Sequence, residues 1–224
     1  MKKNQLEIAC FGLYSVVLAQ ENGADRIELC LDMSVGGISP SSMLVAAARE
    51  ITTSELYVMI RPRGGSFVYN EAELNEMKKA VLDFKNLNAD GFVFGILNED
   101  GTVNEKQNAE LVQLANPLPC TFHRAFDDVP DPHQALEQLI KIGFSSILTS
   151  GGAVNAIAGI DVLENLIRIA NTRIKIIPGG GIRSTNINLL LERLGPNIYH
   201  SSAVLDETDV PSIEEIIKLK KVLS

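Results

Sequence analysis

Five ionisable side chains stand within or at the end of short apolar runs of this 224-residue chain, where charged groups are unusual. They are two carboxylates, one guanidinium and two imidazoles: Glu7, Glu28, Arg61, His123 and His200. Burying such groups is unfavourable unless they pair, and paired buried groups acquire shifted pKa values. Together they suit acid–base chemistry, with Glu7, Glu28 or His123 as general base and His200 as acid or electrophile. A structural ion-pair network is the alternative.

A further set of residues follows the apolar runs and suits an anion or other small ligand. Asp127 comes shortly after His123 and joins the candidate catalytic residues, and Arg61 and Arg63 are expected to clamp an anion. The candidate ligand-binding residues are Arg63, Gly64, Arg124, Ser150, Gly180, Gly181, Ser201 and Ser202. The glycines and serines among them fall in loops where backbone N–H groups could bind phosphate, although tight turns would need the same glycines.

The elements that must position these residues alternate regularly along the chain. Eight short apolar runs precede eight segments of helical period, and most helical segments end in a turn signal such as Asn22-Gly23. The predicted strands cover 6–10, 26–30, 56–61, 91–97, 120–124, 146–150, 174–178 and 198–202. Eight such units predict an α/β chain with one (β/α)₈ barrel domain over 1–224, with an open doubly wound sheet as the alternative. No Gly-x-Gly-x-x-Gly follows the first strand, so we expect no nucleotide cofactor.

The period of two along a strand assigns each residue to the barrel interior or to the helices. In the first strand Glu7 and Ala9 face inward, while Cys10 faces the helices. In the second strand the inward positions belong to Glu28 and Cys30. The five ionisable residues are therefore expected to converge inside the barrel, at the carboxyl ends of its strands.

Composition restricts the classes of partner. The net charge of −8 disfavours nucleic acid, because proteins that bind a phosphate backbone usually carry a basic excess. The three cysteines form no even disulfide framework and no CxxC pair, and no apolar run suits a signal sequence or a membrane span. We expect a cytoplasmic protein with no membrane partner that forms a homo-oligomer, a dimer being favoured.

Several ordered motifs together resemble the CutC family of copper-homeostasis proteins. They are Leu6-Glu7-Ile8, the segments 23–30, 36–41, 59–65, 121–127 and 148–151, and His200-Ser201-Ser202-Ala203. The resemblance spans nearly the whole chain. It implies a cytoplasmic (β/α)₈ barrel, a role in copper handling, and Cu(I) binding through cysteine thiols.

Two departures from the family bear on copper. Ala9 occupies the position where relatives often have a cysteine, which leaves Cys30 as the expected metal ligand, with Met59 and the imidazoles of His123 or His200 nearby. The segment after Val204 is also shorter than in many relatives. Three functions therefore stay open: a Cu(I)-binding homeostasis protein, an isomerase, lyase or aldolase that acts on a small anionic or phosphorylated molecule, and a non-catalytic sensor of such a molecule.

Overall fold

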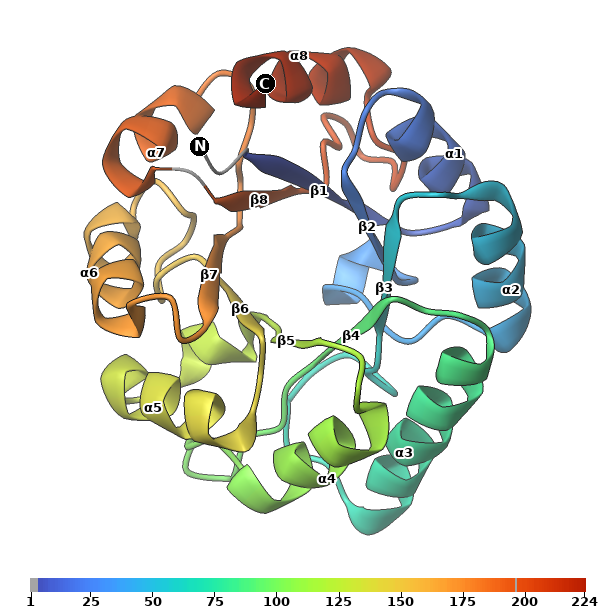
Figure 1. Cartoon of the computed structure of the whole chain (residues 1–224), viewed down its shortest axis with the longest axis vertical. Helices are drawn as coiled ribbons and strands as arrows, with labels where there is room; N and C mark the ends of the chain where they lie inside the picture. The colour runs from blue at the N-terminus through green and yellow to red at the C-terminus, as the bar shows by residue number, and fades with distance from the viewer. Residues whose placement is uncertain (1–3, 196) are drawn as a thin grey trace.

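The computed structural model describes residues 4–195 and 197–224, and it forms a barrel of eight parallel strands inside a ring of eight α-helices (Figure 1). The strands are β1 (Gln5–Cys10), β2 (Arg26–Leu29), β3 (Glu55–Met59), β4 (Gly91–Phe94), β5 (Cys120–Phe122), β6 (Ser146–Thr149), β7 (Lys175–Pro178) and β8 (Ile198–Ser201). The helices are α1 (Leu13–Glu21), α2 (Ser42–Ile51), α3 (Glu71–Asn86), α4 (Glu105–Ala115), α5 (Pro132–Ile142), α6 (Ile160–Ala170), α7 (Ile187–Leu194) and α8 (Ile213–Leu223). The predicted fold class is confirmed, although several predicted strands run one to three residues too far.

The strands are ordered β7-β6-β5-β4-β3-β2-β1-β8, each parallel to its neighbour. Within the described residues no ladder joins β7 to β8. Instead, the side-chain amide of Asn197 donates a hydrogen bond to the backbone carbonyl of Ile176 and links these two strands. The barrel is therefore nearly closed, and its first and last strands, β1 and β8, lie side by side.

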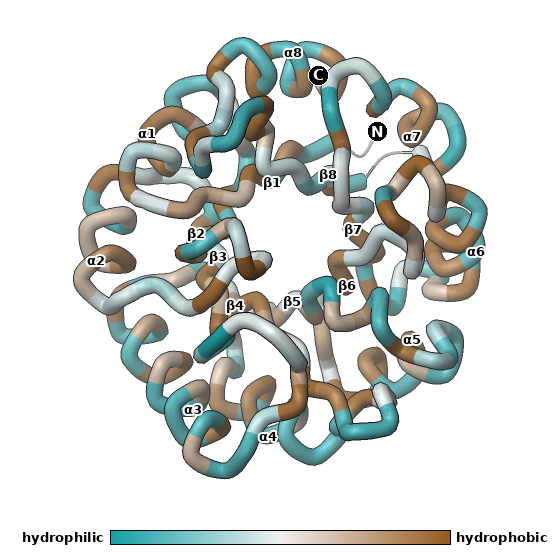
Figure 2. The backbone as a smooth tube through the Cα atoms, turned by 180° about the vertical axis from the view of Figure 1, so that it is seen from behind, coloured by the Kyte–Doolittle hydropathy of each residue, from teal (hydrophilic) through white to brown (hydrophobic). Residues whose placement is uncertain are grey.

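Local signals in the sequence account for where several helices begin and end. Asn70 and Glu73 form a reciprocal capping box at the start of α3. Asp131 caps α5, which has Pro132 in its first turn and ends at Gly143 with a φ of 102°. Seen from the opposite side, hydrophobic and hydrophilic residues alternate along the helices of the outer ring (Figure 2). Such amphipathic helices bury one face against the strands.

The main core fills the layer between strands and helices, and it includes Leu6, Ile8 and Cys10 of β1. Two smaller apolar clusters consist of residues on the barrel's inner surface. One contains Cys30, Tyr57, Met59 and Val93, and the other contains Leu148, Ile177 and Ile198. Apolar layers thus fill part of the interior, and the ionisable residues occupy the rest. No helix in 4–195 or 197–224 is long and apolar enough to cross a bilayer.

Candidate functional site

The register of three strands places Glu7 between two cationic partners. Glu7 of β1 is opposite Arg26 of β2 on one side and His200 of β8 on the other. The Arg26 guanidinium donates to Glu7 Oε2, and the His200 imidazole Nδ1 lies 2.7 Å from Glu7 Oε1. All three side chains lie on the inner surface, where Glu7 is 1% exposed. Glu7 is therefore the centre of a buried ion cluster.

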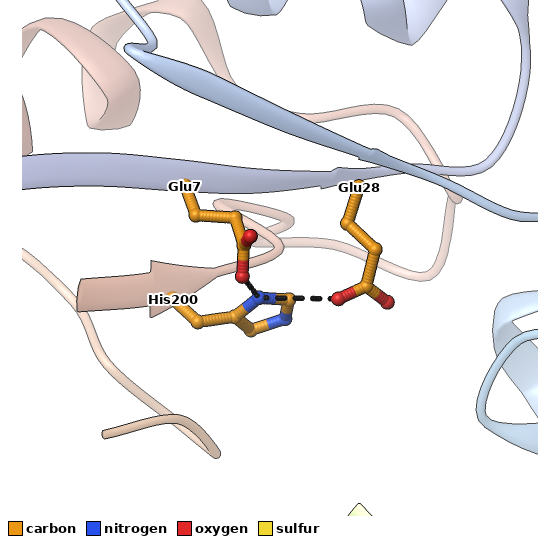
Figure 3. A group of neighbouring side chains, drawn as sticks. All are labelled: Glu7, Glu28 and His200. Carbon is orange, nitrogen blue, oxygen red and sulfur yellow. Dashed lines mark hydrogen bonds and ion pairs between the residues drawn. The ribbon is translucent and has the colours of Figure 1, made fainter. Parts of the chain in front are cut away.

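Glu28 lies next to this cluster, and its carboxyl group faces the same His200 nitrogen, Nδ1, that Glu7 contacts (Figure 3). Its Oε2 atom is 3.6 Å from His200 Nδ1, too far for a hydrogen bond, and this oxygen has no hydrogen-bond partner among the described residues. Burial, reinforced by the negative charge of Glu7 and opposed by His200, raises the pKa of Glu28 to about 7. Glu28 is thus a carboxyl that can hold or release a proton near neutral pH.

The neighbouring charges stabilise the ionised forms of Glu7 and His200. Burial alone would raise the pKa of Glu7, but Arg26 and His200 outweigh it and lower that pKa to about 2. Burial alone would lower the pKa of His200, but Glu28 and Glu7 raise it above its ordinary value. Two carboxyls on one surface therefore differ in protonation, the arrangement that general acid–base chemistry uses.

Arg61 also faces the interior, but it does not pair with either glutamate in the structure. Arg61 donates to the backbone carbonyls of Val35, Gly37 and Gly65 at 2.7–3.0 Å and stacks on the Phe67 ring. Arg26, which was not among the candidates, holds Glu7 instead. Its position two residues before Glu28, on the same face of β2, was the signal that could have identified it.

A cavity of about 330 Å³ opens above the cluster, at the carboxyl ends of the strands. Seven of the predicted site residues line it: Glu28, Cys30, Arg61, His123, Arg124, Asp127 and His200. Apolar side chains complete the wall, including those of Phe11, Met33, Met59, Phe67 and Leu148. Glu7 does not line the cavity, but its hydrogen-bond partner His200 does.

His123 follows β5 on the cavity wall and is 4% exposed. Its Nδ1 atom accepts a hydrogen bond from the backbone N–H of Ala125 at 3.2 Å. Burial, with a further contribution from the Arg61 charge, lowers the pKa of His123 to about 3. The imidazole is therefore neutral near pH 7, and Nδ1 serves as an acceptor.

Asp127 holds the neighbouring loops together. Its carboxylate accepts hydrogen bonds from the hydroxyl of Thr149, the backbone N–H groups of Ser150 and Gly152, and the Arg124 guanidinium. Arg124 also donates to the Ser150 hydroxyl at 3.1 Å. With four donors on one carboxylate, Asp127 is suited to positioning Arg124 and the loop after β6.

Other predicted ligand-binding residues do not line this cavity. Arg63 and Gly64 lie outside its wall, because the Arg63 guanidinium turns to Glu73 at the start of α3. This geometry corrects the expectation that Arg63 clamps an anion beside Arg61. The Ser201 hydroxyl donates to the Ile182 carbonyl at 2.7 Å.

The predicted glycines and the remaining serines stabilise the backbone of the loops around the cavity. Gly180 and Gly181 adopt φ values of 96° and 71°, which favour glycine. Ser202 accepts a 3.4 Å hydrogen bond from the Val204 N–H, and Ser150 donates to the Ala153 carbonyl. Within the described chain, then, these hydroxyls already have protein partners.

The three cysteines are free and buried, and they lie in different environments. Cys10 packs in the outer core and Cys30 on the inner surface, as the strand period predicted. Burial, together with the charge of Glu28, raises the pKa of the Cys30 thiol well above its ordinary value. Three sulfur-containing residues line the same cavity: Cys30, Met33 and Met59.

One group of potential metal ligands with oxygen and nitrogen donors was also found in the described residues. Glu7, Glu28 and His200 each offer one ligand atom, and these atoms lie within 4.8 Å of one another. Arg26 already holds Glu7, however, and its positive charge opposes a cation there. The donor set suits hard or borderline metals better than Cu(I).

Comparisons with known proteins agree with this architecture. The model of the CutC family matches residues 4–205. The human copper homeostasis protein cutC homolog is 42% identical over 198 residues, which cover 88% of this chain and 72% of the human protein. A family protein CutC from Mesorhizobium japonicum is 43% identical over 207 residues, covering 92% of this chain and 79% of the relative.

Solved structures give the same result. The putative copper homeostasis protein CutC from Streptococcus agalactiae superposes with a TM-score of 0.85 at 32% identity, covering 90% of this chain and 99% of that structure. Thiamine phosphate pyrophosphorylase from Pyrococcus furiosus has a TM-score of 0.67 at 18% identity and covers 99% of this chain and 96% of its own, a likeness of fold alone. With the barrel, the matched family model and these relatives together, this chain belongs to the CutC family.

Proposed function

We propose that this protein acts in copper homeostasis, the role for which its relatives are named, and that it binds Cu(I) through Cys30. The observation that carries the proposal is the set of three sulfur-bearing residues on one cavity wall: Cys30, Met33 and Met59. A Cβ atom added at Gly37 would meet Cys30 Sγ at 3.4 Å and Met59 Cε at 3.5 Å, so these two side chains meet at one point of the wall. Thiolate and thioether sulfur are the donors that Cu(I) prefers.

These sulfur donors would give only a modest affinity for Cu(I). Cys30 is the one cysteine on the inner wall of the described barrel, because Ala9 stands at the other inward position and Cys10 and Cys120 belong to the outer core. His123 is a poor fourth donor, since its Nδ1 is bonded to the Ala125 N–H. Copper would therefore be bound by one thiol with thioether support.

The test is a Cu(I) titration against a competing chelator. Cys30→Ser should weaken binding at least about tenfold, because it removes the only strong soft donor. Met59→Leu, which keeps the size of the side chain, should weaken binding less. Cys10→Ser is the matched control and should leave affinity unchanged. Equal losses from the two cysteine variants would show that Cys30 is not the ligand.

A second candidate function is favoured by polar atoms that have no partner. Glu28 Oε2, Arg61 Nε and His123 Nε2 are buried without a hydrogen bond within the described residues, and all three residues line the cavity. Buried polar atoms are normally satisfied, so such a set indicates a missing partner. We propose that a small anionic molecule provides it, in an enzyme of isomerase, lyase or aldolase type.

A thermal-shift screen of carboxylates and phosphorylated metabolites tests this second function. The melting temperature of the wild type should rise with at least one anion, and Arg124→Gln, which removes a charge at the cavity rim, should reduce the rise. A ligand that is bound but not converted would favour the sensor alternative. No stabilisation by any member of the screen would argue against a small-molecule function.

We also propose a cytoplasmic location and a homodimer. Three free cysteines fit a reducing compartment, and two-fold dimers are the commonest assembly. Cell fractionation tests the location, and light scattering tests the assembly. Recovery in a membrane or secreted fraction, or a monomeric mass, would contradict these proposals.

A further inference from the structure

The His123 ring is held rigidly on the cavity wall. A Cβ atom at Gly95 would meet the ring at 2.8 Å and 2.9 Å from Nδ1 and Cε1, so the glycine backbone packs directly against the imidazole. The Phe67 ring lies on another side, with its centroid 4.8 Å from that of His123. With neighbours on these sides, the imidazole has little freedom to turn, and its two nitrogen atoms keep separate roles.

The hydrogen bond at Nδ1 determines which nitrogen carries the proton. A backbone N–H can only donate, so Nδ1 must accept from Ala125 with its lone pair. A neutral imidazole then has its proton on Nε2. Burial and the nearby Arg61 charge lower the pKa of His123 to about 3, which keeps the ring neutral. Nε2–H is thus a neutral donor, and it has no acceptor within the described residues.

A cationic donor, Arg124, lines the same cavity. Arg124 follows His123 in the chain, and its guanidinium is fixed by Asp127 through Nε and by Ser150 through Nη2. The Nη1 group makes no hydrogen bond to the part of the chain that the structure describes, and the side chain is 46% exposed. The wall of one cavity therefore carries both an anchored positive charge and a neutral buried donor.

We propose that the His123 Nε2–H binds the carbonyl oxygen of a small oxo compound whose carboxylate or phosphate group lies at Arg124. The inference rests on the second candidate function and specifies the class of its ligand. A neutral donor in a buried site suits an uncharged oxygen, and it polarises a carbonyl without transferring its proton. The anionic group would stay near the rim, where a partly exposed guanidinium binds it with a small desolvation penalty.

The test uses the three histidines of this 224-residue chain, labelled with ¹⁵N, as reporters. Pyruvate and dihydroxyacetone phosphate carry a carbonyl, whereas acetate and inorganic phosphate supply the same anionic groups without one. The carbonyl probes should shift the Nε2 resonance of His123 and bind at least about tenfold more tightly than their matched anions. The resonances of His133, which lies on α5 outside the barrel, should not move.

Two variants separate the inference from general anion binding. His123→Asn should remove the preference for carbonyl probes, and the exposed control His133→Asn should retain it, with folding checked from the melting temperature. Equal His123 shifts from all four probes, or a proton found on Nδ1, would overturn the inference. If anions stabilise the protein but His123→Asn leaves the preference unchanged, the inference fails while the second candidate function stands.

Discussion

Replacing Arg26 by methionine should destabilise this protein severely, because it would leave the Glu7 carboxylate buried without its guanidinium partner. The two side chains are 3% and 1% exposed, so water cannot replace the lost interaction. The partners of Glu7 lower its pKa from 4.5 to about 2. At 1.36 kcal/mol for each pKa unit, the difference corresponds to about 3 kcal/mol of stability near neutral pH. His200 supplies part of this, but breaking a buried pair typically costs about 3–5 kcal/mol.

The effect should depend on pH with a definite sign. The pKa of Glu7 is lower in the folded than in the unfolded state, so its contribution is present above pH 4.5 and is lost as pH falls towards about 2. The stabilities of the wild type and Arg26→Met should therefore converge in acid. A second substitution, Glu7→Gln, should restore part of the loss at neutral pH because it removes the uncompensated charge.

The assay is urea unfolding at neutral and acid pH, with Arg193→Met as the matched control. Arg193 pairs with Asp161 and Glu164 at the surface, where its side chain is 40% exposed. Exposed pairs contribute about 0–1 kcal/mol, so this control should change little. Equal losses from Arg26→Met and Arg193→Met at neutral pH would refute the reasoning about the buried cluster.

Three further substitutions test other parts of the structure. Gly159→Ala should destabilise the protein by about 3 kcal/mol or more, because the new Cβ atom would lie 1.9 Å from the Ser150 carbonyl oxygen. Gly12→Ala is the control, since a Cβ atom there meets nothing within 4 Å. Thermal unfolding should show a large loss for the first variant and little change for the second. Asn108→Ala should cost about 2–3 kcal/mol in urea, since this fully buried amide bonds three backbone groups; a loss near zero would contradict that. In the wild type, the raised pKa of Glu28 should make stability fall as pH rises from 4.5 through about 7. Glu28→Gln should flatten that dependence, and an unchanged slope would contradict the assignment.

The strand period was sufficient to predict which side of the barrel each residue faces. Glu7, Glu28 and Cys30 were placed inward and Cys10 outward from alternation alone, and the structure agrees. This succeeds because a one-residue shift would expose the whole apolar face of a strand. The alternation of eight apolar runs with eight helical segments likewise led directly to the barrel.

The pairing of the charges depends on information that a single strand does not contain. The stagger between neighbouring strands places Arg26 level with Glu7, whereas Arg61 lies beyond the end of β3. Barrel closure sets that stagger, so the pattern of β2 alone indicates that Arg26 faces inward with Glu28 but not that it lies level with Glu7. The orientation of Arg63 depends similarly on the capping box of α3, where Glu73 offers a carboxylate.

The contrast between the two inward-facing histidines is the most direct test of this electrostatic arrangement. A pH series of long-range ¹H–¹⁵N spectra, from about pH 5 to 8, reports the proton position and the titration of each ring. His123 should stay neutral with its proton on Nε2, whereas His200 should titrate with a midpoint above 6.5. A His123 that titrates within this range with a proton on Nδ1, or a His200 midpoint below 6.5, would contradict the account.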